Sequence, residues 1–543
     1  MHQLVKVGLE ISEEKAAIPP VPPGPELILN TDVSRMYLQD SPVLLALFMV
    51  LVTASMAILL KMNKYLKTVT ELIPESGMML FFGAFVHLIF GSLDKIAREV
   101  SGDEGLVIPS IQIPHLVVQH ILIPPIILHA SYELYHPHFF GQIEYILILA
   151  IGATLLNTVI IGLSLRYCFG SLFPEMNLFH CMTFASIMAA VDPVAVLAVF
   201  EVVNADKALY FLVFGEALLN DAVTFVLYEG IRELAAIPTE DMSSTTIMSY
   251  VYILLSFLTS PLFGALIGFV CGLASAFITK YISETTALIK PMIAILFAVL
   301  AYGLTCVFGY SSILSIITYG LTQERYAFGN MSVMASIHTS NIVHTVAIIF
   351  EELIFFLLGC QFAHVGFYAV WDFALAVILT ITVSRIIVTC AICFFINKYT
   401  RKRPINWKWQ ILLIVGGLRG AIAFAMVITY EGPFHRMFYD TTLIVIFFTT
   451  LANGILTKPL VNHLGLREDM AVKTDYVKYY ANDEDQPPRC FARCWGWVDK
   501  MICRVFTKEN AVHDAIMKRL LAREEKDAFH KLERENVVSS TNK

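Results

Sequence analysis

Charged side chains inside long apolar stretches are the residues of this chain best suited to chemistry. An ionisable group at the middle of a membrane costs at least about 2.5 to 3.5 kcal/mol, so it normally persists only beside a partner or in a water-filled cavity. Their presence therefore predicts a path for ions or protons. The residues concerned are Asp192, Glu216, Asp221, Glu351, Glu352, Arg385 and Arg419.

Asp192 and Asp221 lie in neighbouring apolar segments, and each has a local sequence that favours access by an ion. Pro193 lacks an amide donor and disfavours helical geometry at Asp192, which predicts a break beside this acid. Ala217 lies four residues before Asp221, so a small side chain on the same helix face leaves room for a cavity. The alternative is that both acids are structural groups at helix ends.

A second break is predicted at residues 416–420, where the sequence Gly-Gly-Leu-Arg-Gly interrupts an apolar stretch and carries Arg419. If the first six and the last six of thirteen apolar segments form inverted repeats around the seventh, the two broken segments occupy corresponding positions in the two repeats. Paired broken helices point to a transporter site near the midplane, where helix ends face ions. Asp192 and Arg419 would then offset the charges of facing helix ends. The alternative is close packing of small residues between helices.

The elements that position these residues are membrane helices. Hydrophobic residues make up 57% and charged residues 15% of the 543 positions, which is more apolar than a soluble domain can bury. About thirteen stretches, from 43–60 to 441–461, approach the length needed to cross a bilayer. The sequence therefore predicts an all-α polytopic membrane protein. The three predicted regions are an N-terminal segment over 1–41, a membrane domain over 42–465 and a tail over 466–543.

Several other classes of function are disfavoured. The formal charge of -7 argues against a nucleic-acid partner. The ten cysteines have no framework spacing, and no nucleophile-base pair, phosphate loop or metal-ligand spacing indicates an enzyme.

The Lys and Arg residues of the loops predict the orientation, because cytosolic loops carry the excess of positive charge. An N-terminus outside places the basic residues between 398 and 408 in the cytosol, and an odd number of spans puts the tail there too. The sequon at Asn330 then faces the cytosol, so we expect it to carry no glycan.

The tail contains apolar residues at helical spacing opposite basic ones, which predicts a helix bound to inner-leaflet lipid or to a partner's groove. The apolar positions are Phe491, Trp495, Val498, Ile502 and Val505.

Four motifs in order resemble the plasma-membrane type of animal sodium/proton exchangers over roughly residues 42–465. They are PPIIL at 124–128, AVDPVAVLAVF at 190–200, FGEALLNDAV at 214–223 and GGLRGAIAF at 416–424. The resemblance implies thirteen helices in a core and a dimerisation domain, a homodimer in the plasma membrane, and elevator-like exchange that regulates intracellular pH and sodium. It also suggests a calcineurin-homologous EF-hand partner on the tail.

Carried over by position, the resemblance makes Asp221 the shared carrier of sodium and proton, with Asn220 beside it. Asp192 would line the place where the two broken helices cross. Glu216 and Arg385 would form a structural ion pair. Low dielectric disfavours the charged form of a carboxylate, so a partly buried acid can exchange protons near cytosolic pH. One carboxylate can hold a proton or a sodium ion but not both. A neutral amide at 220 adds no second proton, which predicts one-for-one, electroneutral exchange without a cofactor.

Three positions depart from the family pattern: His129 replaces an acid, Ala217 replaces a serine, and Cys306 lies near the place of a glutamate. Histidine titrates near neutral pH, which makes His129 a candidate pH-sensitive residue, although a lone histidine on an apolar helix is more often a packing residue. The departures motivate a second hypothesis, a regulatory relative that has lost transport or altered its selectivity. An ion channel is a third.

Overall fold

The structure of this chain is a computed structural model. The residues it describes are 75–101, 115–170, 173–203, 205–235, 244–282, 289–363, 365, 371–399, 404–466, 502 and 505–507. They belong to the unit formed by residues 52–543. The predicted segments 1–41 and 43–60 lie outside the described residues, as does most of the predicted tail.

The described chain contains helices and no β-strand. The segments η1, η2 and η3 are π-helical, and η4 is a short 3₁₀ helix. In chain order the elements are α5 (Glu75–Ser101), α6 (His115–Val117), η1 (Val118–Leu122), α7 (Ile123–Leu134), α8 (Pro137–Gly141), α9 (Ile143–Leu147), η2 (Ile148–Ala153), α10 (Thr154–Tyr167), α11 (Leu178–Ile187), α12 (Val194–Val203), α13 (Lys207–Ala235), α14 (Ser244–Tyr281), α15 (Ile289–Phe308), α16 (Ser312–Thr322), η3 (Gln323–Ala327), η4 (Phe328–Asn330), α17 (Val333–Phe362), α18 (Trp371–Tyr399), α19 (Trp407–Val415), α20 (Ala421–Ile428) and α21 (His435–Leu464).

Seven helices of the described chain are long and apolar enough to cross a membrane. A helix satisfies its own backbone polar groups, which is what a lipid environment requires. Met292, Leu296 and Val299 on α15 are each more than 60% exposed and recur at helical spacing, as expected of a lipid-facing stripe. The prediction of a helical, multi-pass membrane protein is confirmed, whereas thirteen helices, inverted repeats and a dimerisation domain stay predictions.

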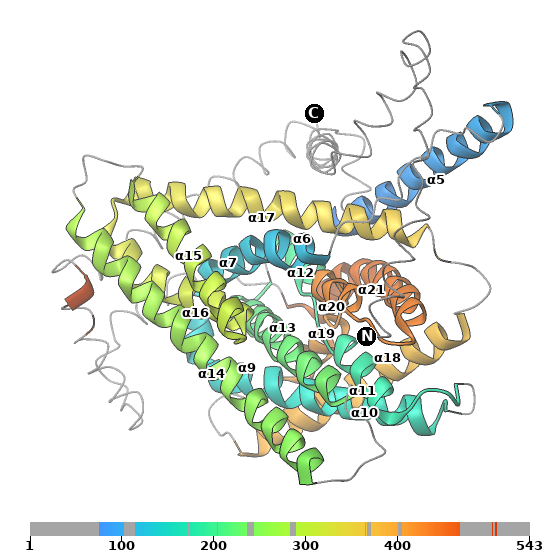
Figure 1. Cartoon of the computed structure of the whole chain (residues 1–543). Coiled ribbons are helices and arrows are strands. Elements are labelled where there is room, and N and C mark those ends of the chain that lie inside the picture. The colour runs from blue at the N-terminus through green and yellow to red at the C-terminus, as the bar shows by residue number, and fades with distance from the viewer. Residues whose placement is uncertain are drawn as a thin grey trace, which may run out of the picture. The chain divides into compact units, whose positions relative to one another are not determined.

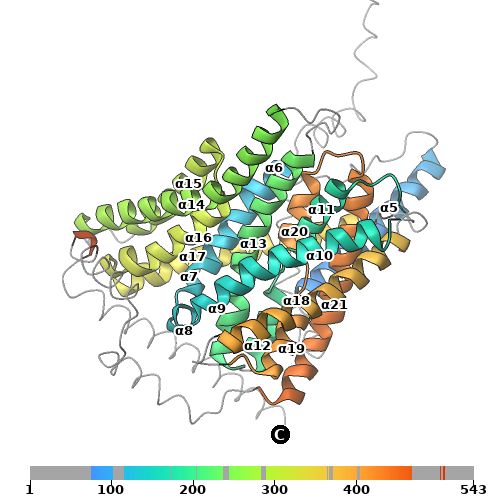
Figure 2. The ribbon, with the colours of Figure 1, turned by 90° about the horizontal axis from the view of Figure 1, so that it is seen from below.

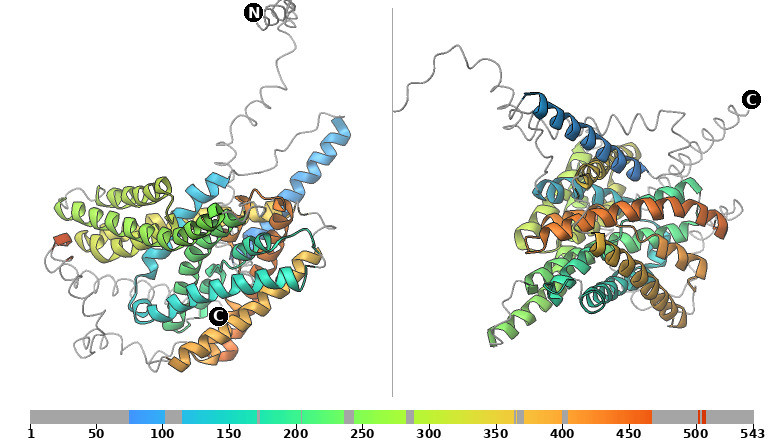
Figure 3. Two further views of the ribbon diagram at one scale, coloured as in Figure 1. Left: turned by 60° about the horizontal axis from the view of Figure 1, so that its bottom comes forward. Right: turned by 90° about the vertical axis from the view of Figure 1, so that its right-hand side faces the viewer.

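Helix α13 lies among the other helices and is the most buried of the seven long apolar ones in the described chain. The helices α14, α15 and α16 pack on one another, away from α18 and α21 (Figures 1 and 2). The same separation is visible in the left view of Figure 3. Because α13 contacts α14 and α16 as well as α11 and α20, its side chains reach both groups of helices.

Helices α5 and α17 approach each other closely through two glycines. A Cβ atom on Gly83 would lie 2.1 Å from the Phe356 carbonyl oxygen, and one on Gly359 would lie 2.0 Å from the Leu80 carbonyl oxygen. Both distances are far shorter than van der Waals contact. The small-residue contact therefore sets the separation of the two helices.

Part of the predicted tail helix packs against the membrane domain. Ile502 lies in an apolar cluster with Ala276 of α14 and Tyr326 of η3. Lys280 donates a hydrogen bond to the Val505 carbonyl over 2.8 Å, and Val505 itself is 46% exposed. One residue of the predicted amphipathic face is thus buried by the chain's own helices, while binding of the tail to lipid or to an EF-hand partner stays a prediction.

Candidate functional site

Two interrupted helices meet at their breaks. The first separates α11, which ends at Ile187, from α12, which begins at Val194. The second separates α19 from α20 over residues 416–420. Asp192 donates its backbone N–H to the Leu418 carbonyl over 2.9 Å, as an isolated antiparallel bridge. The segments beside Pro193 and at residues 416–420, both predicted to be broken, therefore lie in direct contact. This contact between the two breaks is the crossing.

The Asp192 carboxylate accepts hydrogen bonds at the start of two helices. Its Oδ1 accepts from the Val194 N–H of α12 over 3.1 Å, and its Oδ2 accepts from the Ala421 N–H of α20 over 3.3 Å. A helix N-terminus carries partial positive charge, so one acid stabilises both ends. Gly420 is required beside it, because a Cβ there would lie 1.6 Å from the Asp192 Oδ2.

Arg419 supplies the opposite charge at the same crossing. Its side chain is buried, with 1% exposed, and Nη1 donates to the Ala190 carbonyl, which follows the end of α11. Its backbone N–H donates to the Thr449 hydroxyl of α21 over 3.2 Å. A guanidinium beside carbonyls at a helix C-terminus offsets their partial negative charge.

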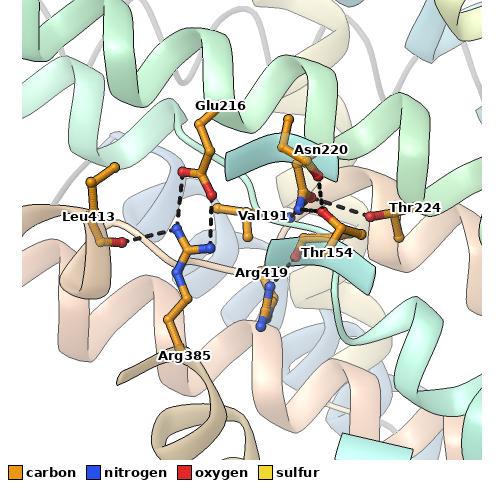
Figure 4. Close-up of polar contacts among 10 residues, drawn as sticks. Thr154, Val191, Glu216, Asn220, Thr224, Arg385, Leu413 and Arg419 are labelled. Atoms are coloured by element: carbon orange, nitrogen blue, oxygen red, sulfur yellow. Dashed lines mark hydrogen bonds and ion pairs between the residues drawn. The ribbon is translucent and has the colours of Figure 1, made fainter. Parts of the chain in front are cut away.

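Asn220 of α13 holds the first break in place through its amide group (Figure 4). The Oδ1 atom accepts from the Val191 N–H over 3.0 Å and from the Thr224 hydroxyl over 3.3 Å. The Nδ2 atom donates to the hydroxyl of Thr154, the first residue of α10 after the π-helical segment η2. The fully buried amide therefore makes its contacts within the protein and positions the break next to Asp221.

The Asp221 carboxylate lies on α13 with 7% of the residue exposed. Within the described part of the chain it has no hydrogen-bond or ion-pair partner. The charged groups that act on it are Asp192, Glu216 and Arg419. Ala217, one turn earlier, is fully buried and adds no polar atom. A buried carboxylate with both oxygens available suits a proton or a hard cation.

Glu216 and Arg385 join α13 to α18. Arg385 donates from Nη1 to Oε1 over 2.8 Å and from Nη2 to Oε2 over 3.0 Å, and Nη2 also donates to the Leu413 carbonyl of α19 over 3.0 Å (Figure 4). Such bidentate pairs fix orientation as well as distance. The pair therefore links α13, α18 and α19 close to the crossing.

His129 is not in contact with the crossing residues. Its Nε2 lies 2.7 Å from the His344 Nδ1 of α17 and 3.4 Å from Glu133. The structure thus brings Asp192, Asn220 and Arg419 together at the breaks, with Asp221 adjacent, and places His129 in a separate cluster.

Sequence reasoning missed Thr154 and Thr449, whose hydroxyls accept from Asn220 and Arg419. It also left open the role of Glu351 on α17, which interacts electrostatically with Asp192. The only available signal for Glu351 was an acid within an apolar segment.

Comparison with known proteins gives a consistent set of relatives. The family model described as "Sodium/hydrogen exchanger, transmembrane" matches residues 50–463. Sodium/hydrogen exchanger 3 of Homo sapiens is 32% identical over 411 residues, which cover 74% of this chain and 47% of that protein. Na(+)/H(+) exchanger protein 7 of Caenorhabditis elegans is 33% identical over 420 residues, covering 76% of this chain and 52% of that one.

The chain spans about half the length of these curated relatives. Among solved structures, a sodium proton antiporter from Methanocaldococcus jannaschii is similar with a TM-score of 0.48 at 18% identity, covering 72% of this chain and 97% of that one.

Proposed function

Because this chain belongs to the sodium/hydrogen exchanger family, we propose that it is a secondary transporter that exchanges sodium for protons across a membrane. The observation that carries the proposal is Asp221: a carboxylate beside two helix breaks, with no partner in the described chain. Backbone carbonyls at broken helices serve as further oxygen ligands for sodium in transporters.

Competition at Asp221 would give the coupling. A proton neutralises the carboxylate, and a sodium ion takes the place of that proton, so the two loads exclude each other. If the barrier is crossed only by a loaded carboxylate, each proton moved one way returns with a sodium ion moved the other way. Asp192 and Arg419 are bound to helix ends, whereas the Asp221 carboxylate has no such contact in the described chain and can carry the ion.

The surroundings of Asn220 support electroneutral stoichiometry. The Thr154 hydroxyl donates its hydrogen to the Ala150 carbonyl, so it can only accept from the residue at 220. The amide nitrogen of Asn220 meets this requirement, whereas an ionised carboxylate would place an acceptor against an acceptor. The amide holds this contact without titrating, so position 220 contributes no second proton and one proton exchanges for one sodium ion.

Elevator-like movement of the crossing as a single body is part of the proposal. The Glu216–Arg385 pair, the Asp192 caps and the Arg419 contacts link α11, α12, α13, α18, α19 and α20. Such links favour movement of these helices together relative to α14, α15 and α16. The same proposal includes a homodimer in the plasma membrane with its N-terminus outside, and regulation of intracellular pH and sodium.

Reconstituted proteoliposomes test the proposed activity against its rivals. An imposed sodium gradient should drive proton flux through the purified chain, and clamping the membrane voltage at different values should leave the rate unchanged. Absence of flux under both sodium and potassium gradients would favour a non-transporting relative, the hypothesis that Ala217, His129 and Cys306 motivate. A steady current would indicate a channel instead.

A further inference from the structure

A cluster of three metal-ligating side chains lies between α7 and α17. His129 and Glu133 are one turn apart on α7, and His344 comes from α17. The ligand atoms of the three residues all lie within 4.8 Å of one another. The cluster shares no residue with the crossing at Asp221.

The separations are close to those of a metal site. Two ligands bound tetrahedrally at about 2.0 to 2.1 Å from zinc lie about 3.3 Å apart. The His129 Nε2 is 3.4 Å from the Glu133 Oε1, and it is 2.7 Å from the His344 Nδ1. A bound ion therefore requires that the two imidazole nitrogens move apart by about 0.6 Å, while the Glu133 oxygen already lies within 4.8 Å of both of them.

The donor set indicates which ions would bind. Two imidazole nitrogens with one carboxylate oxygen suit zinc, nickel or copper, whereas sodium, magnesium and calcium prefer oxygen ligands. Zinc accepts water as a further ligand, and the protein encloses neither His344 nor the Glu133 side chain, which is 43% exposed.

We propose that His129, Glu133 and His344 bind a divalent transition-metal ion of the zinc class, and that this ion joins α7 to α17. The nitrogens of the two histidines face each other at hydrogen-bond distance. Only one of these two nitrogens carries a proton. When that proton moves to the other nitrogen of the same ring, both rings stay neutral and both facing nitrogens become available to the ion.

One acid of α17 is coupled electrostatically to both the metal site and the crossing. Glu351 interacts electrostatically with both Glu133 and Asp192, and it follows His344 by two turns on the same face of α17. A divalent charge at the cluster would favour the charged form of Glu351 and oppose the approach of sodium to this acid. This consequence rests on the proposed exchange activity, whereas the site itself does not.

Zinc binding to the purified full-length chain tests the site without any transport assay. Competition with a chromophoric chelator should show one tight site. His344→Ala and His129→Ala should each weaken binding at least about 100-fold, because loss of even an outer-shell partner weakens metal binding 10- to 100-fold. His338→Ala is the matched control, since His338 is an exposed histidine on the same helix outside the cluster.

Cobalt provides a second readout, because its visible ligand-field absorption reports coordination by nitrogen and oxygen. The parent chain and His338→Ala should give the band, and His344→Ala should lose it. Equal zinc binding by the parent chain and both cluster variants would overturn the proposal, as would the absence of a tight site in the parent chain.

The consequence for transport is measured by comparing each protein with itself, with and without zinc. Zinc should slow sodium-driven proton flux in the parent chain and in His338→Ala, and a chelator should restore the rate. In His344→Ala the ratio of the two rates should be close to one. Tight binding that leaves flux in the parent chain unchanged would retain the metal site and overturn its effect on exchange.

Discussion

At the scale of single residues, the crossing depends on a balance of charge between side chains and helix ends. Asp192 accepts from two helix starts, and Arg419 donates to a carbonyl after the end of a third helix. Broken helices within a membrane need such partners, because no lipid group can satisfy their free backbone atoms. The side chains that stabilise the breaks are therefore distinct from Asp221, whose carboxylate has no hydrogen-bond partner in the described part of the chain.

Asp192→Ala should lower the stability of the folded protein. Loss of one N-cap costs about 0.5 to 2 kcal/mol, and this change removes the cap of both α12 and α20. Thermal unfolding in detergent measures the effect. Asp372→Ala, which removes an exposed acid in the first turn of α18, is the control, and equal melting temperatures of the two variants would contradict the capping role.

Arg385→Met should destabilise the fold strongly, because it leaves the Glu216 carboxylate buried without its partner. Breaking one side of a buried pair costs about 3 to 5 kcal/mol, and the double variant Glu216→Leu/Arg385→Met should recover much of that loss. Arg232→Met breaks a half-exposed pair with Glu229 and should cost at most about 1 kcal/mol. Denaturant unfolding of the three variants provides the measurement, and the account fails if Arg385→Met behaves like Arg232→Met.

At the scale of helices, local sequence predicted the two breaks but could not identify all their partners. Pro193 and the glycines at 416–420 restrict the backbone directly, so their effects are visible in sequence. Thr154 and Thr449 were missed because each hydroxyl donates to a carbonyl four residues earlier in the chain, as threonines on helices commonly do. Their second contacts depend on packing.

The cluster on α7 and α17 shows the same limit over a longer distance. His129 and Glu133 have the four-residue spacing of neighbours on one helix face, but His344 lies 215 positions from His129. Sequence spacing alone gave no metal-ligand pattern, because the third ligand is brought near by the packing of two helices. The helical class and the buried acids, by contrast, follow from composition.

Gly359→Ala should disrupt the contact between α5 and α17, because its Cβ would lie 2.0 Å from the Leu80 carbonyl oxygen. We expect a loss of stability of about 1 to 3 kcal/mol, as is usual for overpacking. Gly303→Ala on α15 is a matched control, since a Cβ there has no neighbour within 4 Å. Melting temperatures of the two variants in detergent test the idea, and it is wrong if both substitutions are equally tolerated.

At the scale of the whole molecule, residues distant in sequence lie together at one end of the helices. Asn330 donates from Nδ2 to the Ala276 carbonyl over 2.9 Å and to the Phe506 carbonyl over 2.8 Å. With Lys280 bound to Val505, the end of α14, the segment η3–η4 and residues 505–507 share this end. The tail and the sequon at Asn330 were both predicted to face the cytosol.

The sequon at Asn330 should carry no glycan when the chain is made in glycosylating cells. The side chain is 1% exposed and its amide nitrogen is hydrogen-bonded inside the protein, so an oligosaccharide has no space there. Treatment with an enzyme that removes N-linked glycans should leave the electrophoretic mobility of the protein unchanged. A mobility shift that Asn330→Gln abolishes would contradict both the burial and the predicted orientation.

Sodium-driven proton flux by Asp221→Asn in proteoliposomes is the most direct measurement of the central claim. The substitution keeps the size of the side chain while removing the charge for which sodium and proton compete, so coupled flux should fall to the level of protein-free vesicles. Asp372→Asn should retain the parent rate, and both variants should be shown to be folded by gel filtration and thermal unfolding. Coupled exchange that persists in folded Asp221→Asn would contradict the account.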